Sequence, residues 1–115
     1  MRYILLICTD ESSDQAMSPA EGEAQMAGYM KFGEDMTKRG VLKGGERLHP
    51  TSDATTVQVR DGELLTSDGP FAETKEQIGG FYLVDAKDLD EAIEIAAKIP
   101  GASKGSIEVR PIWEM

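Results

Sequence analysis

Two residues in this sequence could exchange a proton with a substrate. His49 is the only histidine, and it stands before Pro50, whose ring favours an extended conformation at position 49. Histidine titrates close to neutral pH, so it is the first candidate for a general acid or base. Asp68 directly follows a strand that returns along the same expected sheet, and its carboxylate could orient the imidazole. A histidine with an ordinary structural hydrogen bond explains the same pattern, and spacing alone favours that alternative.

Charged side chains that could hold a substrate follow Asp68. Residues 68–76 read Asp-Gly-Pro-Phe-Ala-Glu-Thr-Lys-Glu and place four charged side chains around a rigid turn. Lys75 and Arg110 could bind an anionic group, and Glu73 could position them. Ion pairs within the fold explain these three residues equally well. A simple connector, with a tight turn and a solvated edge, also explains the segment.

Other chemistries find little support in the sequence. Cys8 is the only cysteine, and it lies within an apolar strand, where a thiol is usually inert. One histidine and one cysteine on distant strands do not give the ligand spacing of a zinc site. Gly79 and Gly80 precede a strand, whereas a phosphate-binding loop precedes a helix. We therefore expect no metal and no organic cofactor.

Composition narrows the class of protein and its partners. The 115 residues correspond to one domain, and 21 acidic against 12 basic residues give a net charge of −9. Nucleic acid binding needs basic clusters, which are absent, and an anionic membrane surface is disfavoured for the same reason. The apolar run 3–8 is too short for a membrane span and lacks the features of a signal peptide. We therefore expect a cytoplasmic protein.

The elements that must position these residues alternate between strands and helices. The first strand, Arg2–Thr9, is apolar on both faces. A polar loop should follow, and then a helix that begins with Ser18 as cap, Pro19 at the first position and Glu21 completing a capping box. Gly40 should close this helix. Its apolar stripe, which we expect to pack in the core, contains Met26, Tyr29, Met30, Gly33 and Met36.

The remaining elements are expected to complete the order β-α-β, a hairpin, then a second β-α-β unit. A second helix should begin at Asp88 and end at Pro100, with a hairpin turn at Asp61-Gly62. The buried stripe of this helix should contain Leu89, Ala92, Ile93, Ala96 and Ala97. Further strands are expected at 41–49, 55–60, 63–67, 78–85 and 106–113.

This order predicts an α+β fold, the ferredoxin-like split βαβ plan with an inserted hairpin. Two helices can cover only one face of such a sheet. The strands at 2–9 and 78–85 are nevertheless apolar on both faces, so something must cover the second face. A second copy of the chain is the simplest cover, and we expect a homodimer.

The stretch from Thr66 to Phe81, TSDGPFAETKEQIGGF, resembles the signature of DGPF-domain proteins in the YCII-related family. Similarity extends to both ends, so the chain is expected to be a single domain over 1–115. Membership in this family implies a dimeric α/β barrel in which two ferredoxin-like sheets pack face to face. The resemblance also implies that His49 and Asp68 line a cleft that forms the active site.

Three alternatives for the function remain open, and the sequence does not decide whether the protein is an enzyme. The first is a small cofactor-independent enzyme that acts on a small organic molecule, with His49 as acid or base and Asp68 as its partner. Relatives in the wider superfamily include isomerases, dehydrochlorinases and cofactor-free monooxygenases. The second is a non-catalytic ligand-binding or regulatory module, because genes of such proteins often lie beside those of sigma factors. A scaffold without a ligand is a third alternative.

Overall fold

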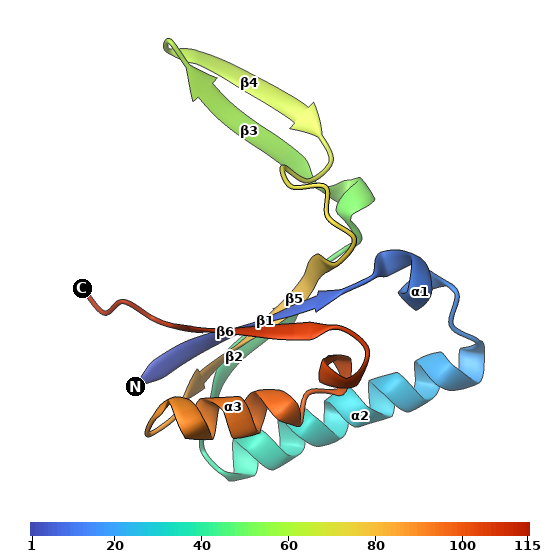
Figure 1. Ribbon diagram of the computed structural model, residues 1–115, viewed down its shortest axis with the longest axis vertical. Helices are drawn as coiled ribbons and strands as arrows, with labels where there is room; N and C mark the ends of the chain where they lie inside the picture. Colours follow the sequence, from blue (N-terminus) through green and yellow to red (C-terminus); the bar gives the residue numbers. More distant parts are fainter.

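The computed structural model describes residues 1–115 as a sheet covered by helices, with a hairpin that projects from it (Figure 1). The chain order is β1 (Arg2–Thr9), α1 (Glu11–Gln15), α2 (Pro19–Lys38), β2 (Leu42–Arg47), η1 (Thr51–Asp53), β3 (Thr55–Arg60), β4 (Glu63–Asp68), β5 (Gln77–Asp85), α3 (Leu89–Ala97), η2 (Pro100–Ser103) and β6 (Ser106–Pro111). No helix is long and apolar enough to cross a bilayer.

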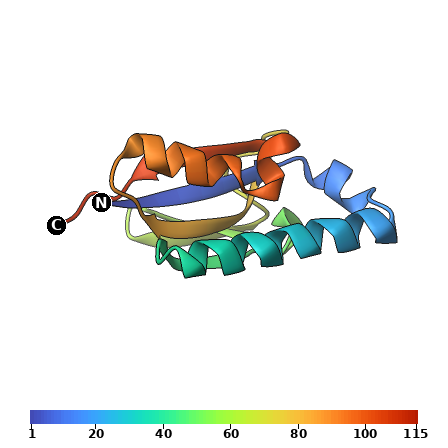
Figure 2. The ribbon, with the colours of Figure 1, turned by 90° about the horizontal axis from the view of Figure 1, so that it is seen from below.

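The main sheet has the strand order β2-β5-β1-β6, and every neighbouring pair is antiparallel. This order confirms the predicted ferredoxin-like α+β fold. Helices α2 and α3 lie side by side on one face of the sheet (Figure 2). No element of the chain forms a layer on the other face.

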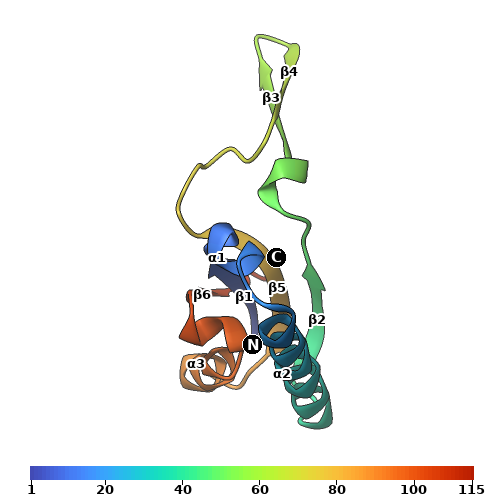
Figure 3. The same ribbon diagram turned by 90° about the vertical axis from the view of Figure 1, so that its right-hand side faces the viewer.

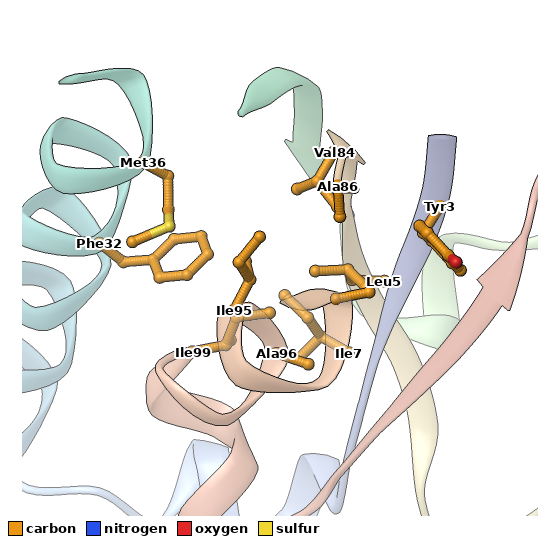
Figure 4. Close-up of a cluster of buried hydrophobic side chains, with 11 residues drawn as sticks. Tyr3, Leu5, Ile7, Phe32, Met36, Val84, Ala86, Ile95, Ala96 and Ile99 are labelled. Atoms are coloured by element: carbon orange, nitrogen blue, oxygen red, sulfur yellow. The ribbon is translucent and has the colours of Figure 1, made fainter. Parts of the chain in front are cut away.

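The core lies between that pair of helices and the two central strands (Figure 4). Its fully buried large side chains come from both layers: Leu5, Val84, Ile95 and Ile99. Only 14 of the 115 residues are buried, and the radius of gyration is 16.0 Å. A compact chain of this length would have a radius of about 13 Å. The chain is therefore unusually extended for its size.

The ends of α2 confirm the signals in the sequence. The Ser18 hydroxyl accepts from the backbone N–H of Glu21, and the Glu21 carboxylate accepts from that of Ser18. Gly40 follows the helix with a φ of +74°, a conformation that glycine adopts without strain. The loop expected before Ser18 contains a short helix instead, α1, because Asp10 caps it through the backbone N–H of Ser12.

The buried stripes of the helices differ from the prediction. On α2, Phe32 and Met36 are buried, whereas Met26 and Met30 are 49% and 62% exposed. On α3, Ala92, Ile95 and Ala96 are buried, whereas Leu89 and Ile93 are about half exposed. Each helix contacts the sheet through a narrower face than its apolar residues would allow.

The β3–β4 hairpin stands apart from the rest of the chain, on the side of the sheet away from the helices (Figure 3). Asp61 and Gly62 form its turn with φ values of 52° and 78°, which confirms the predicted tight turn. Every residue of β4 is exposed. The hairpin is therefore paired within itself and receives little support from the core.

Candidate functional site

A pocket that could hold a ligand lies on the helix side of the sheet. It is a pocket of about 590 Å³ between the first half of α2 and the adjoining ends of β1, β2 and β5. Short helix α1 and the segment after β2 complete its wall. A pocket of this volume suits a small organic molecule.

Glycines in β2 and β5 shape the floor of this pocket. A Cβ at Gly45 would lie 2.6 Å from the Tyr82 ring and 2.8 Å from the Phe81 carbonyl oxygen, so only glycine lets that ring lie against the strand. A Cβ at Gly80 would lie 3.0 Å from the backbone oxygen of Glu46. The strand register also shifts between Leu42 and Gly44, as expected for glycines within a strand.

Two phenols, those of Tyr29 and Tyr82, line the pocket. Burial raises the pKa of Tyr29 on α2, while its contact with the backbone of Gly101 acts in the opposite direction. Burial also raises the pKa of Tyr82 on β5, and the nearby Tyr29 contributes. The Tyr82 ring packs against Phe32 with 4.8 Å between ring centroids. Both hydroxyls therefore stay protonated at neutral pH and can donate a hydrogen bond to a ligand.

A carboxylate ties α1 to the segment that carries His49. Glu11 accepts from the backbone N–H of Thr51 at 2.8 Å and from its hydroxyl at 2.7 Å. Beside it, Asp14 accepts from the Thr9 hydroxyl at 2.7 Å. These hydrogen bonds join β1, α1 and η1 around one end of the pocket.

His49 lies at the rim of the pocket, two residues beyond the end of β2. Its Nδ1 lies 3.0 Å from Oδ2 of Asp53. A carboxylate oxygen accepts, so Nδ1 is the donor in this contact, and the other ring nitrogen, Nε2, has no hydrogen-bond partner in the chain. The side chain is 87% exposed, and its carboxylate partner 61%. The pair is thus a solvated acid–base group beside a pocket.

The carboxylate beside His49 in this chain is Asp53, and no hydrogen bond or ion pair joins His49 to Asp68. Asp68 ends β4 and pairs in register with Thr55, which begins β3. It therefore lies at the base of the hairpin, at the end of the molecule that also carries His49. The local signal for Asp53 is the sequence HPTSD, in which a single turn after Pro50 returns the chain to the histidine.

The three predicted substrate-binding residues lie outside the pocket lining. Glu73 and Lys75 are exposed in the loop before β5. The hydrogen bond from Ser12 is the main cause that lowers the pKa of Asp10, and the charge of Lys75 contributes a smaller part. Arg110 pairs in register with Ile4 on β1 and forms an ion pair with Glu108. Both β6 side chains lie on the sheet face without helices, so the structure does not bring this trio together.

Sequence reasoning missed Arg47, a cation in the pocket lining. It ends β2, and its guanidinium has no hydrogen-bond or ion-pair partner within the chain. The available signal was its position two residues before His49, because residues i and i+2 of a strand share a face. Arg47 supplies positive charge to a lining that also contains three acidic residues, Glu11, Asp14 and Glu46.

The thiol and the acidic side chains form no further centre. No group of three or more His, Cys, Asp and Glu side chains is arranged to hold a metal ion. Cys8 lies half-buried on β1, where burial is the main cause that raises the pKa of its thiol. The thiol is therefore protonated at neutral pH and a poor nucleophile.

Comparison with known proteins identifies the family. The model of the YCII-related domain matches residues 1–115, the full length described above. The chain belongs to the YCII-related family. An uncharacterized protein of Rhizobium meliloti (strain 1021) is 43% identical over 114 residues, which cover 97% of this chain and 92% of the relative. The YCII-related domain thus contains the pocket, the hairpin and both candidate aspartates.

Proposed function

We propose that this protein binds a small organic molecule in the pocket between α2 and the sheet, and that His49 exchanges a proton with it. The observation that carries the proposal is the occurrence of His49, Arg47 and two phenols around one pocket of about 590 Å³. General acid–base catalysis by a positioned imidazole contributes roughly 10²–10⁴-fold in rate. That suits an isomerisation or elimination that needs no cofactor.

Asp53 is the carboxylate that orients the imidazole in this proposal, because it lies 3.0 Å from Nδ1. Asp68 stays a candidate for a second carboxylate, because it lies at the base of the hairpin next to the η1 segment. The two aspartates can be separated by Asp53→Asn and Asp68→Asn variants. Loss of activity in only one of them identifies the partner of His49.

The substrate class follows from Arg47. An unpaired guanidinium in a pocket wall favours a ligand with a carboxylate or phosphate group, which it can bind through two parallel hydrogen bonds. The phenols of Tyr29 and Tyr82 favour a planar or apolar body for the same ligand. We therefore infer a small organic anion.

Binding can be tested with three probes of similar shape: benzoate, benzyl alcohol and benzylamine. Backbone amide spectra should show benzoate shifting signals of the pocket, and Arg47→Gln should weaken that binding by at least about tenfold. Arg110→Gln is the matched control, because Arg110 lies outside the pocket. Preference for benzylamine, or shifts confined to the loop at 69–76, would refute the inferred site and ligand class.

Catalysis is tested by proton exchange. For a bound anion that carries an acidic C–H, His49→Gln should slow its exchange with D₂O by about 10²–10⁴-fold and leave the binding constant within a few-fold. The exposure of His49, 87%, favours a second candidate, a ligand-binding module without turnover. Unchanged exchange in His49→Gln together with tight benzoate binding would select that module.

We also propose that two copies pair through the sheet face without helices. Ile4, Leu6, Phe81 and Leu83 lie on that face, since their neighbours in sequence point toward the helices. The small buried fraction and large radius of the single chain support this proposal. Sedimentation should give twice the mass of one chain, and Leu6→Asp should split or unfold the pair. A wild-type chain that sediments as a monomer would overturn it.

A further inference from the structure

We propose that the pocket between α2 and the sheet takes a zwitterion of the amino acid type, with the carboxylate of the ligand on Arg47 and its ammonium group on Asp14. The inference deepens the function proposed above and rests on it, because it requires that an anionic group binds at Arg47 in this pocket. It adds a second charged contact and makes Asp14 a residue that determines specificity.

The lining of the pocket carries more negative than positive charge. Three carboxylates, those of Glu11, Asp14 and Glu46, line it together with one guanidinium, that of Arg47. A simple organic anion would be attracted by the guanidinium and repelled by the carboxylates. A ligand that also carries a cation turns one of these repulsions into an attraction. The charge of the lining therefore favours a zwitterion over an anion.

Asp14 is the carboxylate that is free to accept from a cation. Glu11 already accepts two hydrogen bonds, one at each oxygen. Glu46 pairs in register with Phe81, so its side chain belongs to the sheet face without helices. On Asp14 only Oδ2 is taken, by the Thr9 hydroxyl at 2.7 Å, and Oδ1 has no hydrogen-bond partner in the chain.

Thr9 fixes the position of this carboxylate. It is the only buried residue with a polar side chain, and alternation along β1 places it on the helix side of the sheet. Glycines pack around it: a Cβ at Gly105 would lie 3.1 Å from its Cγ2, and a Cβ at Gly101 would lie 3.7 Å from the same atom. A carboxylate held by such a residue loses little freedom when a ligand binds, so more of the interaction appears as affinity.

Arg47 and Asp14 approach the pocket from two sides of its floor. Arg47 pairs with Gly80 on β5, and Gly80 pairs with Ile7 on β1, so two strand spacings, about 10 Å, separate Arg47 from β1. Thr9, which holds Asp14, lies about 7 Å further along β1. The Cα atoms of Arg47 and Thr9 are therefore roughly 12 Å apart, a separation that leaves room for one small molecule between the two charged side chains.

The phenol of Tyr29 is near both charges. Burial is the main cause that raises its pKa, and among the nearby charges Asp14 raises this pKa whereas Arg47 lowers it. Gln25, one turn earlier on α2, lines the same pocket, and its amide makes no hydrogen bond within the chain. No buried side-chain nitrogen or oxygen lacks a partner, so the free groups of Asp14 and Gln25 are open to a ligand.

The test compares three probes with one carbon skeleton: L-phenylalanine, 3-phenylpropanoate and 2-phenylethylamine. The first carries both charges, and each of the others carries one. Titrations followed by backbone amide spectra should show L-phenylalanine binding at least about tenfold more tightly than 3-phenylpropanoate, because a charge-assisted hydrogen bond is added. The amine should bind more weakly than L-phenylalanine, because it cannot use Arg47.

The Asp14→Asn variant tests the carboxylate itself. It removes the charge and keeps an oxygen that can accept from the Thr9 hydroxyl. The preference for L-phenylalanine over 3-phenylpropanoate should fall below about threefold. Binding of 3-phenylpropanoate should not weaken, because a repelling charge is removed. Glu23→Gln is the matched control with the same change of charge, since Glu23 is exposed on α2 outside the lining, and it should keep the wild-type preference.

The outcomes separate this inference from the function on which it rests. Equal affinities for L-phenylalanine and 3-phenylpropanoate in the wild-type protein, or a preference that survives Asp14→Asn, would overturn the zwitterion and leave the anion site at Arg47 intact. Tightest binding of 2-phenylethylamine, or pocket signals that stay unchanged with all three probes, would overturn both proposals.

Discussion

Glu11 connects helix α1 to the η1 turn beside His49, and replacing Glu11 gives a testable prediction. Its carboxylate accepts two hydrogen bonds from Thr51, at 2.8 and 2.7 Å. Thr51 in turn begins the turn that brings Asp53 to His49, because the Ala54 N–H donates to the Thr51 carbonyl. Glu11→Ala should therefore release the η1 turn from α1 and loosen the rim of the pocket.

The size of the effect follows from the two hydrogen bonds. A hydrogen bond to a charged group contributes about 1.5–3 kcal/mol when buried, and removal of one partner leaves the other unpaired. Glu11 and Thr51 are only partly buried, so water replaces much of what is lost. We expect a total of about 2 kcal/mol in the free energy that opens this segment. That corresponds to roughly a 30-fold increase in its open population.

Native-state hydrogen exchange measures this opening directly. The Thr51 amide should exchange about 30-fold faster in Glu11→Ala, while amides of the α3 core keep their wild-type rates. Ser13→Ala is the control, because Ser13 lies on the same short helix and its side chain makes no hydrogen bond in the chain. Benzoate binding should weaken in parallel. Unchanged exchange at Thr51, or an equal rise at α3, would refute the role assigned to Glu11.

Two further predictions test the walls of the pocket. Gly45→Ala should lower the free energy of urea unfolding by about 2 kcal/mol, because the added Cβ would meet the Tyr82 ring and a carbonyl oxygen. Gly33→Ala on α2 is the control: its added Cβ meets no atom, so it should raise that free energy by about 0.5–1 kcal/mol. Burial raises the pKa of Tyr29 and Tyr82 in the folded chain above the unfolded pKa of about 10. Their contribution to stability is therefore fully present below about pH 10 and is lost as the pH rises through the folded-state pKa. Absorbance titration with unfolding at each pH checks the sign, and a double Tyr→Phe variant should show a weaker alkaline loss.

Local signals in the sequence predicted the fold well. Strands β1 and β3 have their predicted bounds, and the capping box at Ser18 begins α2 as predicted. These features depend on residues within a few positions of one another, so they can be read before any tertiary contact is known. Helix α1 was missed because its five residues contain no apolar stripe, and because Glu11 and Asp14 bind Thr51 and Thr9, contacts that local sequence does not reveal.

The buried faces of the helices could not be predicted as well, because they depend on how each helix sits on the sheet. The apolar residues of α2 cover a wider arc of the helix than the part that contacts the sheet. Whether Met30 or Phe32 is buried therefore depends on tertiary packing. On α2 the helix turns Phe32 inward, toward the Tyr82 ring, and leaves Met26 at the edge of the pocket. Met26 is therefore half exposed because it lines the pocket and does not pack in the core.

The candidate site shows where reasoning from sequence alone ends. The sequence predicts a pair of His49 and Asp68 because their strands are expected to share one sheet. In the structure the chain leaves the main sheet after Arg47, and the hairpin forms a separate two-stranded sheet. The carboxylate at His49 is therefore supplied by the next turn, at Asp53. Asp68 lies at the base of this hairpin, opposite Thr55, so its role as a second carboxylate stays a prediction that the Asp68→Asn variant tests.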